Sequence, residues 1–255
     1  MHRVALGVEY EGTGLCGWQA QAGLCSVEGC LEDALGRVAD HAVSLTCGGR
    51  TDAGVHASAQ VVHFDTSARR PSRGWVLGAN SRLDPRISVR WACPVPAFFH
   101  ARYSATARSY RYSVYNRPVR SALHRLRTAW VRGHLDETRM QAAAGWLVGE
   151  HDFSAFRAAE CQSRSPVRRV TRLDVRREGD LVHIDVTANA FLHHMVRNIA
   201  GMLIEVGRGE REPAGVVQVL AGRDRRRNAP TAPAAGLCLV AVHYPEAFGL
   251  PADPL

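Results

Sequence analysis

The residues best suited to chemistry lie in one polar stretch, Gly48-Gly49-Arg50-Thr51-Asp52-Ala53-Gly54-Val55-His56-Ala57. Its glycines let the backbone or a ligand approach closely. Apolar residues recur with period two on both sides, at 43–45 and 61–64, so the stretch is expected to join two strands. Two interpretations stay open at this level. Asp52 and Arg50 form a surface ion pair on a loop, or Asp52 is a reactive carboxylate.

The composition narrows the class of protein. The chain has 255 residues, enough for one large domain or two small ones with their own cores. Its net charge is +8, and all 32 of its basic residues are arginine. Arginine binds phosphate with a planar fork and stacks on bases, so this charge favours nucleic acid or an anionic metabolite as partner.

The sequence lacks the features of disulfide-rich, zinc-binding, membrane-spanning and secreted proteins. Its seven cysteines are scattered without a CxxC pair, which argues against a disulfide framework and against a zinc site. No apolar run approaches the roughly 20 residues that cross a bilayer. The first residues lead into a strand pattern and have no signal-peptide features. A cytoplasmic protein without a membrane partner is therefore expected.

Apolar periodicity predicts an α+β fold. Strands are expected at 2–10, 42–47, 58–66, 87–91, 108–115, 167–176, 180–188 and 236–244, and helices at 26–40, from 71, from 136, at 191–207 and at 213–220. The order strand, helix, strand, strand occurs on both sides of about residue 105. We therefore expect two halves, 1–105 and 106–245, and a loose tail at 246–255.

The strand near 108–115 combines aromatic and basic residues. Tyr110 and Tyr112 share one face, and Arg111 lies on the other. This arrangement suits base stacking beside phosphate contacts. Plain packing of the tyrosines in a core is the alternative.

The helix expected at 191–207 carries one charge beside its apolar stripe. That charge, Arg197, needs a partner, and a carboxylate such as Asp52 would serve. His193 and His194 are adjacent and cannot share a helical face, so we expect structural roles for both and no metal site. The basic stretch 157–169 is either a solvated loop or one that grips a substrate.

With these segments in place, the chain resembles the TruA family of tRNA pseudouridine synthases. The block around Asp52 is highly specific, and shorter blocks follow in the family's order from Gly12 to Pro245. The matching blocks are Gly17-Trp18-Gln19, Gly49 to Ala57, Phe99-His100-Ala101-Arg102, Arg108 to Tyr112, Asp152 to Phe156, His193 to Gly201, Thr231-Ala232-Pro233 and Gly236-Leu237.

The resemblance implies a fold, a reaction and a substrate. The fold is two RNP/ferredoxin-like α+β halves that form a continuous, mainly antiparallel sheet, with flanking helices and an active-site cleft between the halves. The enzyme is an isomerase and a homodimer. It converts uridine to pseudouridine at positions 38 to 40 of the tRNA anticodon stem-loop. The resemblance implies no cofactor and no metal.

Five site residues follow from the matching positions. Asp52 falls on the catalytic aspartate, the nucleophile that acts on a flipped-out base, and Arg197 falls on the basic residue paired with it. Arg50 falls on the arginine that helps to open the RNA and takes the place of the flipped base. Tyr110 falls on the tyrosine that stacks on the target base, and Leu237 on the apolar residue beneath it.

Further arginines are expected to bind RNA phosphates, which position an RNA without reading its sequence. They are Arg102, Arg108, Arg168 and Arg169. Two departures from the family pattern affect local loops and none of the five site residues. Leu15-Cys16 replaces an aromatic-containing pair, and Arg86 replaces an acidic residue.

The chemistry needs one ionised carboxylate and no redox partner, because pseudouridylation only breaks the N1–C1′ bond and rejoins the base through C5. Asp52 either attacks covalently or removes the C2′ proton, and both routes stay open. Two other functions compete. A non-catalytic RNA-binding protein leaves Asp52 unexplained. A metal-dependent nuclease or deaminase lacks its ligand spacings.

Overall fold

The structure, a computed structural model, describes residues 1–21 and 23–251. The chain divides into two compact units. Unit 1 contains Met1–Arg108 and Leu239–Leu255, and unit 2 contains Ser109–Cys238. Most of the closing strand and the segment after it are thus grouped with unit 1. Residues 252–255 of the expected tail lie outside the described residues.

Unit 1 is built on strands in the order β4-β1-β3-β10. Their bounds are His2–Tyr10 for β1, His56–Thr66 for β3, Ile87–Val95 for β4 and Leu237–His243 for β10, and the short β2 (Thr46–Cys47) pairs with β3. The central strand β1 is antiparallel to both β3 and β4. Residues 4–8 of β1 are buried without alternation, so the sheet is covered on both faces.

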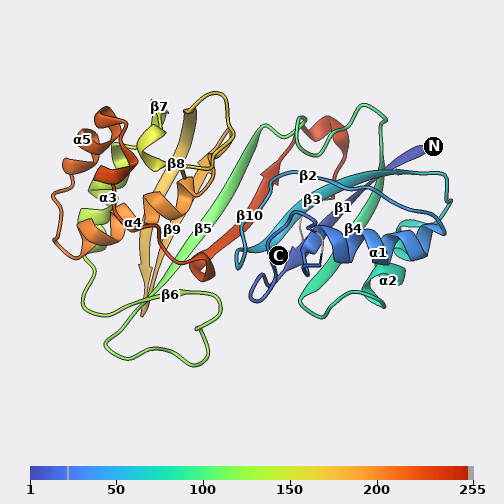
Figure 1. The fold of residues 1–255 in the computed structure, drawn as a ribbon, viewed down its shortest axis with the longest axis horizontal. Coiled ribbons are helices and arrows are strands. Elements are labelled where there is room, and N and C mark those ends of the chain that lie inside the picture. The colour runs from blue at the N-terminus through green and yellow to red at the C-terminus, as the bar shows by residue number, and fades with distance from the viewer. Residues whose placement is uncertain (22, 252–255) are drawn as a thin grey trace. The chain divides into compact units, whose positions relative to one another are not determined.

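Two helices, α1 (Val27–Ala39) and α2 (Ser72–Asn80), pack together beside this sheet (Figure 1). The side chain of Ser26 caps α1 by accepting from the N–H of Gly29. The rings of Phe64 on β3 and Trp75 on α2 meet edge to face at 5.1 Å, and both are fully buried. The helices therefore close one core of unit 1.

A second hydrophobic cluster in unit 1 is formed by side chains of the sheet and of the segments that follow β4 and β10. Val61 and Phe99 are among its buried members, and Phe248 and Leu250 pack against it. The rings of Phe99 and Phe248 lie 5.0 Å apart. The first part of the expected tail thus belongs to the packed unit.

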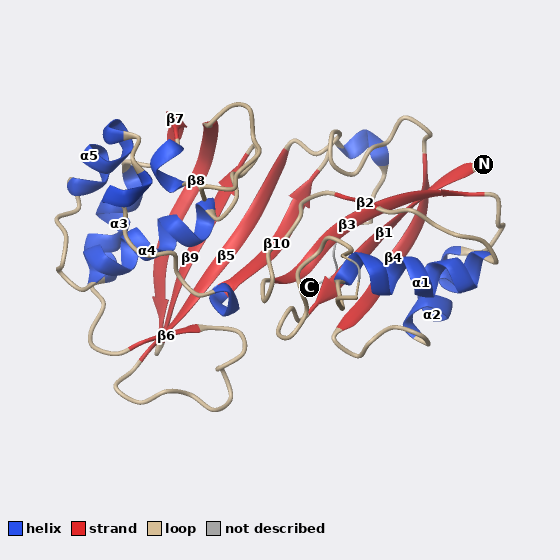
Figure 2. Cartoon of the chain, viewed as in Figure 1, coloured by secondary structure: helices blue, strands red, loops and turns tan. Residues whose placement is uncertain are grey.

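Unit 2 has the strand order β5-β9-β8-β7. The strands span Ala107–Asn116 (β5), Gly149–Asp152 (β7), Val167–Glu178 (β8) and Leu181–Ala188 (β9), and β6 (Ala129–Val131) pairs parallel with β5. Strands β8 and β9 form the expected antiparallel hairpin, which turns at Gly179 with φ +59°. Helices α3 (Glu137–Gly145), α4 (Met195–Gly207) and α5 (Gly215–Gly222) complete the unit (Figure 2).

The prediction of an α+β fold with mainly antiparallel strands is confirmed. Three boundaries were wrong. The strand expected at 87–91 runs on to Val95 as β4. The strand expected at 42–47 is reduced to two residues, because the N–H of Leu45 donates to Glu32 of α1 and not to a strand. The helix expected from residue 191 begins only at Met195, since His194 has a left-handed backbone with φ +61°.

The sequence predicted no disulfide framework and no membrane-spanning helix, and the described residues bear on both points. All seven cysteines are free thiols. No described helix combines the length and the apolar character that crossing a membrane requires.

We expect His63 to make the stability of the protein fall in mild acid. Its Nδ1 accepts a hydrogen bond from the N–H of Ala101 at 3.1 Å, so the neutral ring fits the fold. Burial, and then the charge of Arg3, lower the pKa of His63 to about 4. An unfolded histidine titrates near pH 6.5, so only the unfolded chain takes up this proton between the two values. The free energy of unfolding, measured with urea, should decrease as the pH falls from 7 to 5.

The variant H63Q keeps an acceptor for Ala101 and should show a smaller decrease over the same range. The variant H2Q removes an exposed histidine and serves as the control. An unchanged pH dependence in H63Q would show that His63 does not cause the loss.

Candidate active site

The Asp52 loop, residues 48–57, follows β2 in unit 1, and its last two residues begin β3, so it joins two strands as its apolar flanks predict. Gln60 of β3 is fully buried. Its side-chain amide donates to Gly49 O at 2.5 Å and accepts from Gly49 N at 3.2 Å. The N–H of Gly48 donates to Val61 O at 2.7 Å. The backbone of Gly48 and Gly49 thus has hydrogen-bond partners inside the protein and is fixed in place.

The Gly17-Trp18 segment supports the loop from a second direction. The N–H of Trp18 donates to Thr51 O at 3.0 Å. Gly17 has φ +86°, and a Cβ at this position would lie 2.9 Å from both Thr51 O and Ala53 N. Only glycine permits this approach, which explains the glycine of the Gly17-Trp18-Gln19 block.

Glu28, in the first turn of α1, binds the Gly17-Trp18 segment and fixes its position. Its carboxylate accepts from Trp18 Nε1 at 3.2 Å, from Gln19 Nε2 at 2.6 Å and from the N–H of Ala20 at 2.8 Å. The sequence reasoning missed Glu28. Its position could have been noticed in the sequence, because a carboxylate in the first turn of a helix lies near unpaired backbone N–H donors and is favoured there.

The turn that carries Asp52 is closed on its other side. The hydroxyls of Tyr10 and Thr51 are hydrogen-bonded at 2.8 Å, and the N–H of Val55 donates to Asp52 O at 3.1 Å. Asp52 is half-buried, whereas Arg50 is exposed. In the described part of the chain Arg50 forms no ion pair, so a simple Arg50–Asp52 surface pair does not organise the loop.

Arg108, expected to bind RNA, is buried and bonded to the backbone. It donates to Gly48 O through Nε at 3.1 Å and Nη2 at 2.9 Å, to Arg102 O at 2.6 Å and to Ala105 O at 3.3 Å. One guanidinium thus bridges the start of the Asp52 loop and residues 102–105. These contacts stabilise the fold. Nothing in the sequence around Arg108 indicated that its guanidinium would bind backbone oxygens.

In unit 2, Tyr110 lies on β5 with its ring edge-on to Phe191, 5.0 Å away. Tyr112 shares its face and is fully buried, and its hydroxyl donates to Pro233 O at 2.9 Å. Burial raises the pKa of Tyr112. Core packing therefore accounts for Tyr112, while Tyr110 retains a small exposed fraction of 8%.

Arg197 lies on α4, and the segment 228–236 runs beside it. Its Nε donates to Ala232 O at 2.8 Å, and the N–H of Ala232 donates back to Arg197 O at 3.2 Å. A Cβ on Gly201 would lie 2.1 Å from Pro230 O, so the two backbones are in direct contact. Leu237 begins β10 directly after this segment and is buried.

A polar cluster fixes the same segment against α4. Asn198 accepts from Arg225 Nη2 at 3.0 Å and from Thr231 Oγ1 at 2.7 Å, and its Nδ2 donates to Phe156 O at 2.7 Å. Burial lowers the pKa of Arg225. The sequence did not indicate this cluster, because only Asn198 directly follows Arg197, and Arg225 and Thr231 lie 27 and 33 residues beyond Asn198. The cluster holds the backbone that orients the Arg197 guanidinium.

The remaining candidate arginines differ in what they contact. Arg102 is exposed, with its guanidinium 5.6 Å from the Tyr103 ring. Arg168 folds back on Ser163 and Ser165, and burial lowers its pKa. Arg169 is exposed and lies 3.2 Å from Glu150. Arg102 and Arg169 are thus more accessible than Arg168.

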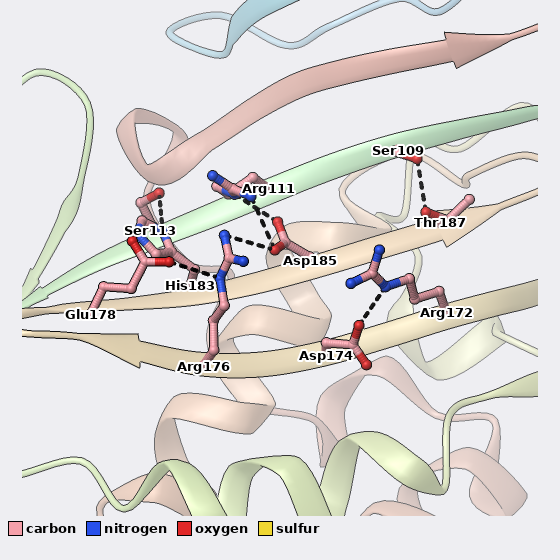
Figure 3. A network of polar contacts seen from close by, with 10 residues as sticks. All are labelled: Ser109, Arg111, Ser113, Arg172, Asp174, Arg176, Glu178, His183, Asp185 and Thr187. Atoms are coloured by element: carbon pink, nitrogen blue, oxygen red, sulfur yellow. Dashed lines mark hydrogen bonds and ion pairs between the residues drawn. The ribbon is translucent and has the colours of Figure 1, made fainter. Parts of the chain in front are cut away.

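Other arginines of unit 2 are neutralised on the sheet itself. Arg111 of β5 makes two hydrogen bonds to Asp185 of β9, at 2.7 and 3.2 Å. Arg176 pairs with Asp185 and Glu178 (Figure 3). This balanced network leaves little positive charge for a phosphate around Asp185.

Comparisons with known proteins bear on both units. A model of the tRNA pseudouridine synthase family matches residues 7–104 and 143–245. The protein named tRNA pseudouridine synthase A from Methylococcus capsulatus is 55% identical over 98% of this chain and 93% of its own length. Proteins of the same name from Photobacterium profundum and Coxiella burnetii are each 54% identical, over 99% and 100% of this chain and 97% and 98% of theirs.

Among solved structures, the crystal structure of the archaeal box H/ACA sRNP Nop10–Cbf5 complex contains a similar chain. The identity is 13% and the TM-score 0.37, over 79% of this chain and 44% of that chain. This likeness is too low to support an argument.

We expect Gln60 to control the order of the Asp52 loop. The variant Q60L leaves the half-buried N–H and C=O of Gly49 without the partners that Gln60 supplies. An unsatisfied buried group costs about 1–3 kcal/mol. The free energy of unfolding should fall by about 2 kcal/mol or more. Backbone amides of residues 48–57 should also exchange with solvent deuterium faster than in the unchanged protein.

The matched control is Q141L. Gln141 also bridges two backbone groups, Val175 N and Leu173 O, but it does so in unit 2. Faster exchange should then appear near residues 173–175 and not in the Asp52 loop. Equal protection of the loop in Q60L and the unchanged protein would refute the role of Gln60.

Proposed function

The chain belongs to the tRNA pseudouridine synthase family, and on that premise we propose that it converts uridine to pseudouridine at positions 38 to 40 of the anticodon stem-loop of tRNA. Membership confirms the resemblance seen in the sequence. In this proposal the enzyme works as a cytoplasmic homodimer. Its basic composition suits a polyanionic substrate.

One observation carries the proposed chemistry. Asp52 stands on a turn whose backbone is fixed by Gln60, Trp18 and Val55, inside the matched part of the chain. A carboxylate held in this way loses little freedom when a substrate arrives, and this favours reaction over plain binding. A non-catalytic RNA-binding protein would not need such support for one acidic residue.

The reaction balances without any added reagent. The N1–C1′ bond breaks, a C5–C1′ bond forms, C5 loses a proton and N1 gains one. No electrons enter or leave. We propose Asp52 as the carboxylate that attacks or that removes the C2′ proton, since both routes need it ionised.

We propose Arg197 as the cationic partner of Asp52. An apolar environment disfavours an ionised carboxylate, and a guanidinium that faces it offsets that cost. The bond from Arg197 Nε to Ala232 O would set the plane in which its remaining donors point.

The other site residues serve the flipped base in this proposal. Unstacking a base costs a few kcal/mol, and an inserted side chain offsets part of it. Arg50 is exposed and follows the fixed backbone at Gly49, so it suits insertion. Tyr110 would stack on the base above Leu237, while Arg102, Arg168 and Arg169 would contact phosphates.

We expect Asp52→Asn and Asp52→Ala to abolish product formation while tRNA binding persists. Loss of a reacting group typically lowers the rate by about 10⁴-fold or more. The substrate is an unmodified tRNA transcript, and pseudouridine is mapped by primer extension after a carbodiimide adduct forms. Binding is followed by filter retention.

Product in the unchanged protein at positions 38 to 40, and none in Asp52→Ala, would support the proposal. Appreciable turnover by Asp52→Ala would overturn the role of Asp52. Product at other positions would overturn the stem-loop assignment. A parallel reaction with a metal chelator tests the competing metal-dependent enzyme, and full activity there would exclude it.

We expect Tyr110→Phe to lose less activity than Tyr110→Ala. The ring provides stacking worth roughly 1–3 kcal/mol, or about 5- to 150-fold, and Phe keeps it. Single-turnover rates on the same transcript measure both variants, with Tyr112→Phe as a control for a fully buried ring. Equal losses in Phe and Ala would assign the role to the hydroxyl group.

A further inference from the structure

The chain contains a basic segment that none of the site residues explains. Residues 117–128 connect β5 to β6, and the segment from Arg117 to Arg132 contains five arginines. No Asp or Glu occurs between Pro85 and Leu135. We call Arg117–Arg132 the basic loop; Figure 1 shows it as the long connection at β6.

The arginines of the basic loop are exposed and mostly unpaired. All five side chains reach solvent. Arg117 lies 3.4 Å from Asp180. Across residues 1–21 and 23–251, no carboxylate lies within 4.0 Å of Arg120, Arg125, Arg127 or Arg132. This contrasts with the sheet of the same unit, where each of Arg111, Arg172 and Arg176 meets an acid (Figure 3).

The basic loop is nevertheless ordered by contacts of its own. Trp130 Nε1 donates to Arg117 O at 2.9 Å, which closes the two ends of the loop. His124 stacks on Tyr115 with ring centroids 5.5 Å apart, and its carbonyl accepts from Thr128 Oγ1 at 2.8 Å. Because the loop is already shaped, a partner that binds it loses less free energy to ordering.

An aromatic surface accompanies the charge. The Trp130 side chain is 44% exposed, and the guanidinium of Arg132 lies 5.7 Å from the centre of its ring. Arginines beside an exposed indole form a surface that accepts phosphate and ribose–base groups without reading sequence. A protein partner would have to bring several carboxylates in matching positions, whereas an RNA backbone carries one charge at every nucleotide.

We propose that the basic loop binds the phosphate backbone of tRNA away from the nucleotide that reacts. The proposal rests on the proposed function in so far as tRNA is the substrate. The loop supplies affinity and salt dependence, and it takes no part in breaking or forming bonds. Its contacts are therefore expected in Kd and not in the rate at saturation.

The test is the triple variant R120Q/R125Q/R127Q. Each lost phosphate contact lowers the slope of log K against log salt by about 0.7–0.9, so the slope should fall by about 2. Over the decade from 1 M to 0.1 M salt this slope change is about two log units, so the Kd for an unmodified tRNA transcript should rise on the order of 100-fold at 0.1 M salt. The single-turnover rate at saturating tRNA should stay within about twofold of the unchanged enzyme.

The matched control is R37Q/R176Q/R208Q. These three arginines are also exposed, and each lies within 4.0 Å of a carboxylate. Both triple variants remove three positive charges, so a general charge effect would weaken both alike. We expect the control to keep a Kd close to that of the unchanged enzyme.

Three results would overturn the proposal. The first is an unchanged Kd and salt slope in the basic-loop variant, and the second is an equal loss of tRNA affinity in the control. The third is a changed oligomeric state with unchanged tRNA binding, which would assign the loop to a second copy of the chain. Should the triple variant fail to fold by thermal melting, the single variants R120Q, R125Q and R127Q must each lower the slope by about 0.7. Failure of the proposed function would appear separately, as tRNA bound without pseudouridine formed.

Discussion

The buried amide of Gln60 is the contact on which the Asp52 loop depends. A glycine-rich loop has no side chains to pack, so its backbone must find hydrogen bonds inside the protein or lose its shape. Gln60 supplies both partners of Gly49, and the Trp18 segment supplies the next contact at Thr51. Asp52 therefore stands on a turn whose backbone is held by hydrogen bonds, which suits the reactive role we propose for it. Its support comes from β3 and, through Glu28, from α1.

Arginine fills three different physical roles in this chain. Arg108 and Arg225 are structural, because five donors in a plane can satisfy several backbone oxygens at once. Arg111 and Arg176 are neutralised by acids on the unit 2 sheet. Within the described residues, four of the five arginines of the basic loop have no carboxylate within 4.0 Å, and only Arg117 is paired. The net charge of +8 is therefore unevenly distributed. On the unit 2 sheet acids offset the arginines, whereas positive charge is concentrated at the basic loop.

Much of the fold could be predicted because local patterns agree with the packing. The cap at Ser26, the alternation along β5 and the turn at Gly179 all act within a few residues. One prediction failed where a group distant in sequence decided the outcome, because Leu45 bonds to Glu32 on a helix and leaves its strand. Another failed at a single backbone conformation, because His194 is left-handed and α4 begins after it. The basic loop went unnoticed because it has charge but no periodicity.

The sequence by itself determined the family and the α+β class, and it singled out the Asp52 loop as the proposed reactive segment, since motif residues and apolar periods are read along the chain. Only the tertiary structure decided which side chains hold that loop. Gln60, Glu28 and Arg108 are ordinary polar residues in the sequence, and their roles arise from buried backbone groups that they meet after folding. The reason is physical: burial makes an unsatisfied hydrogen bond costly, and burial exists only in the folded chain.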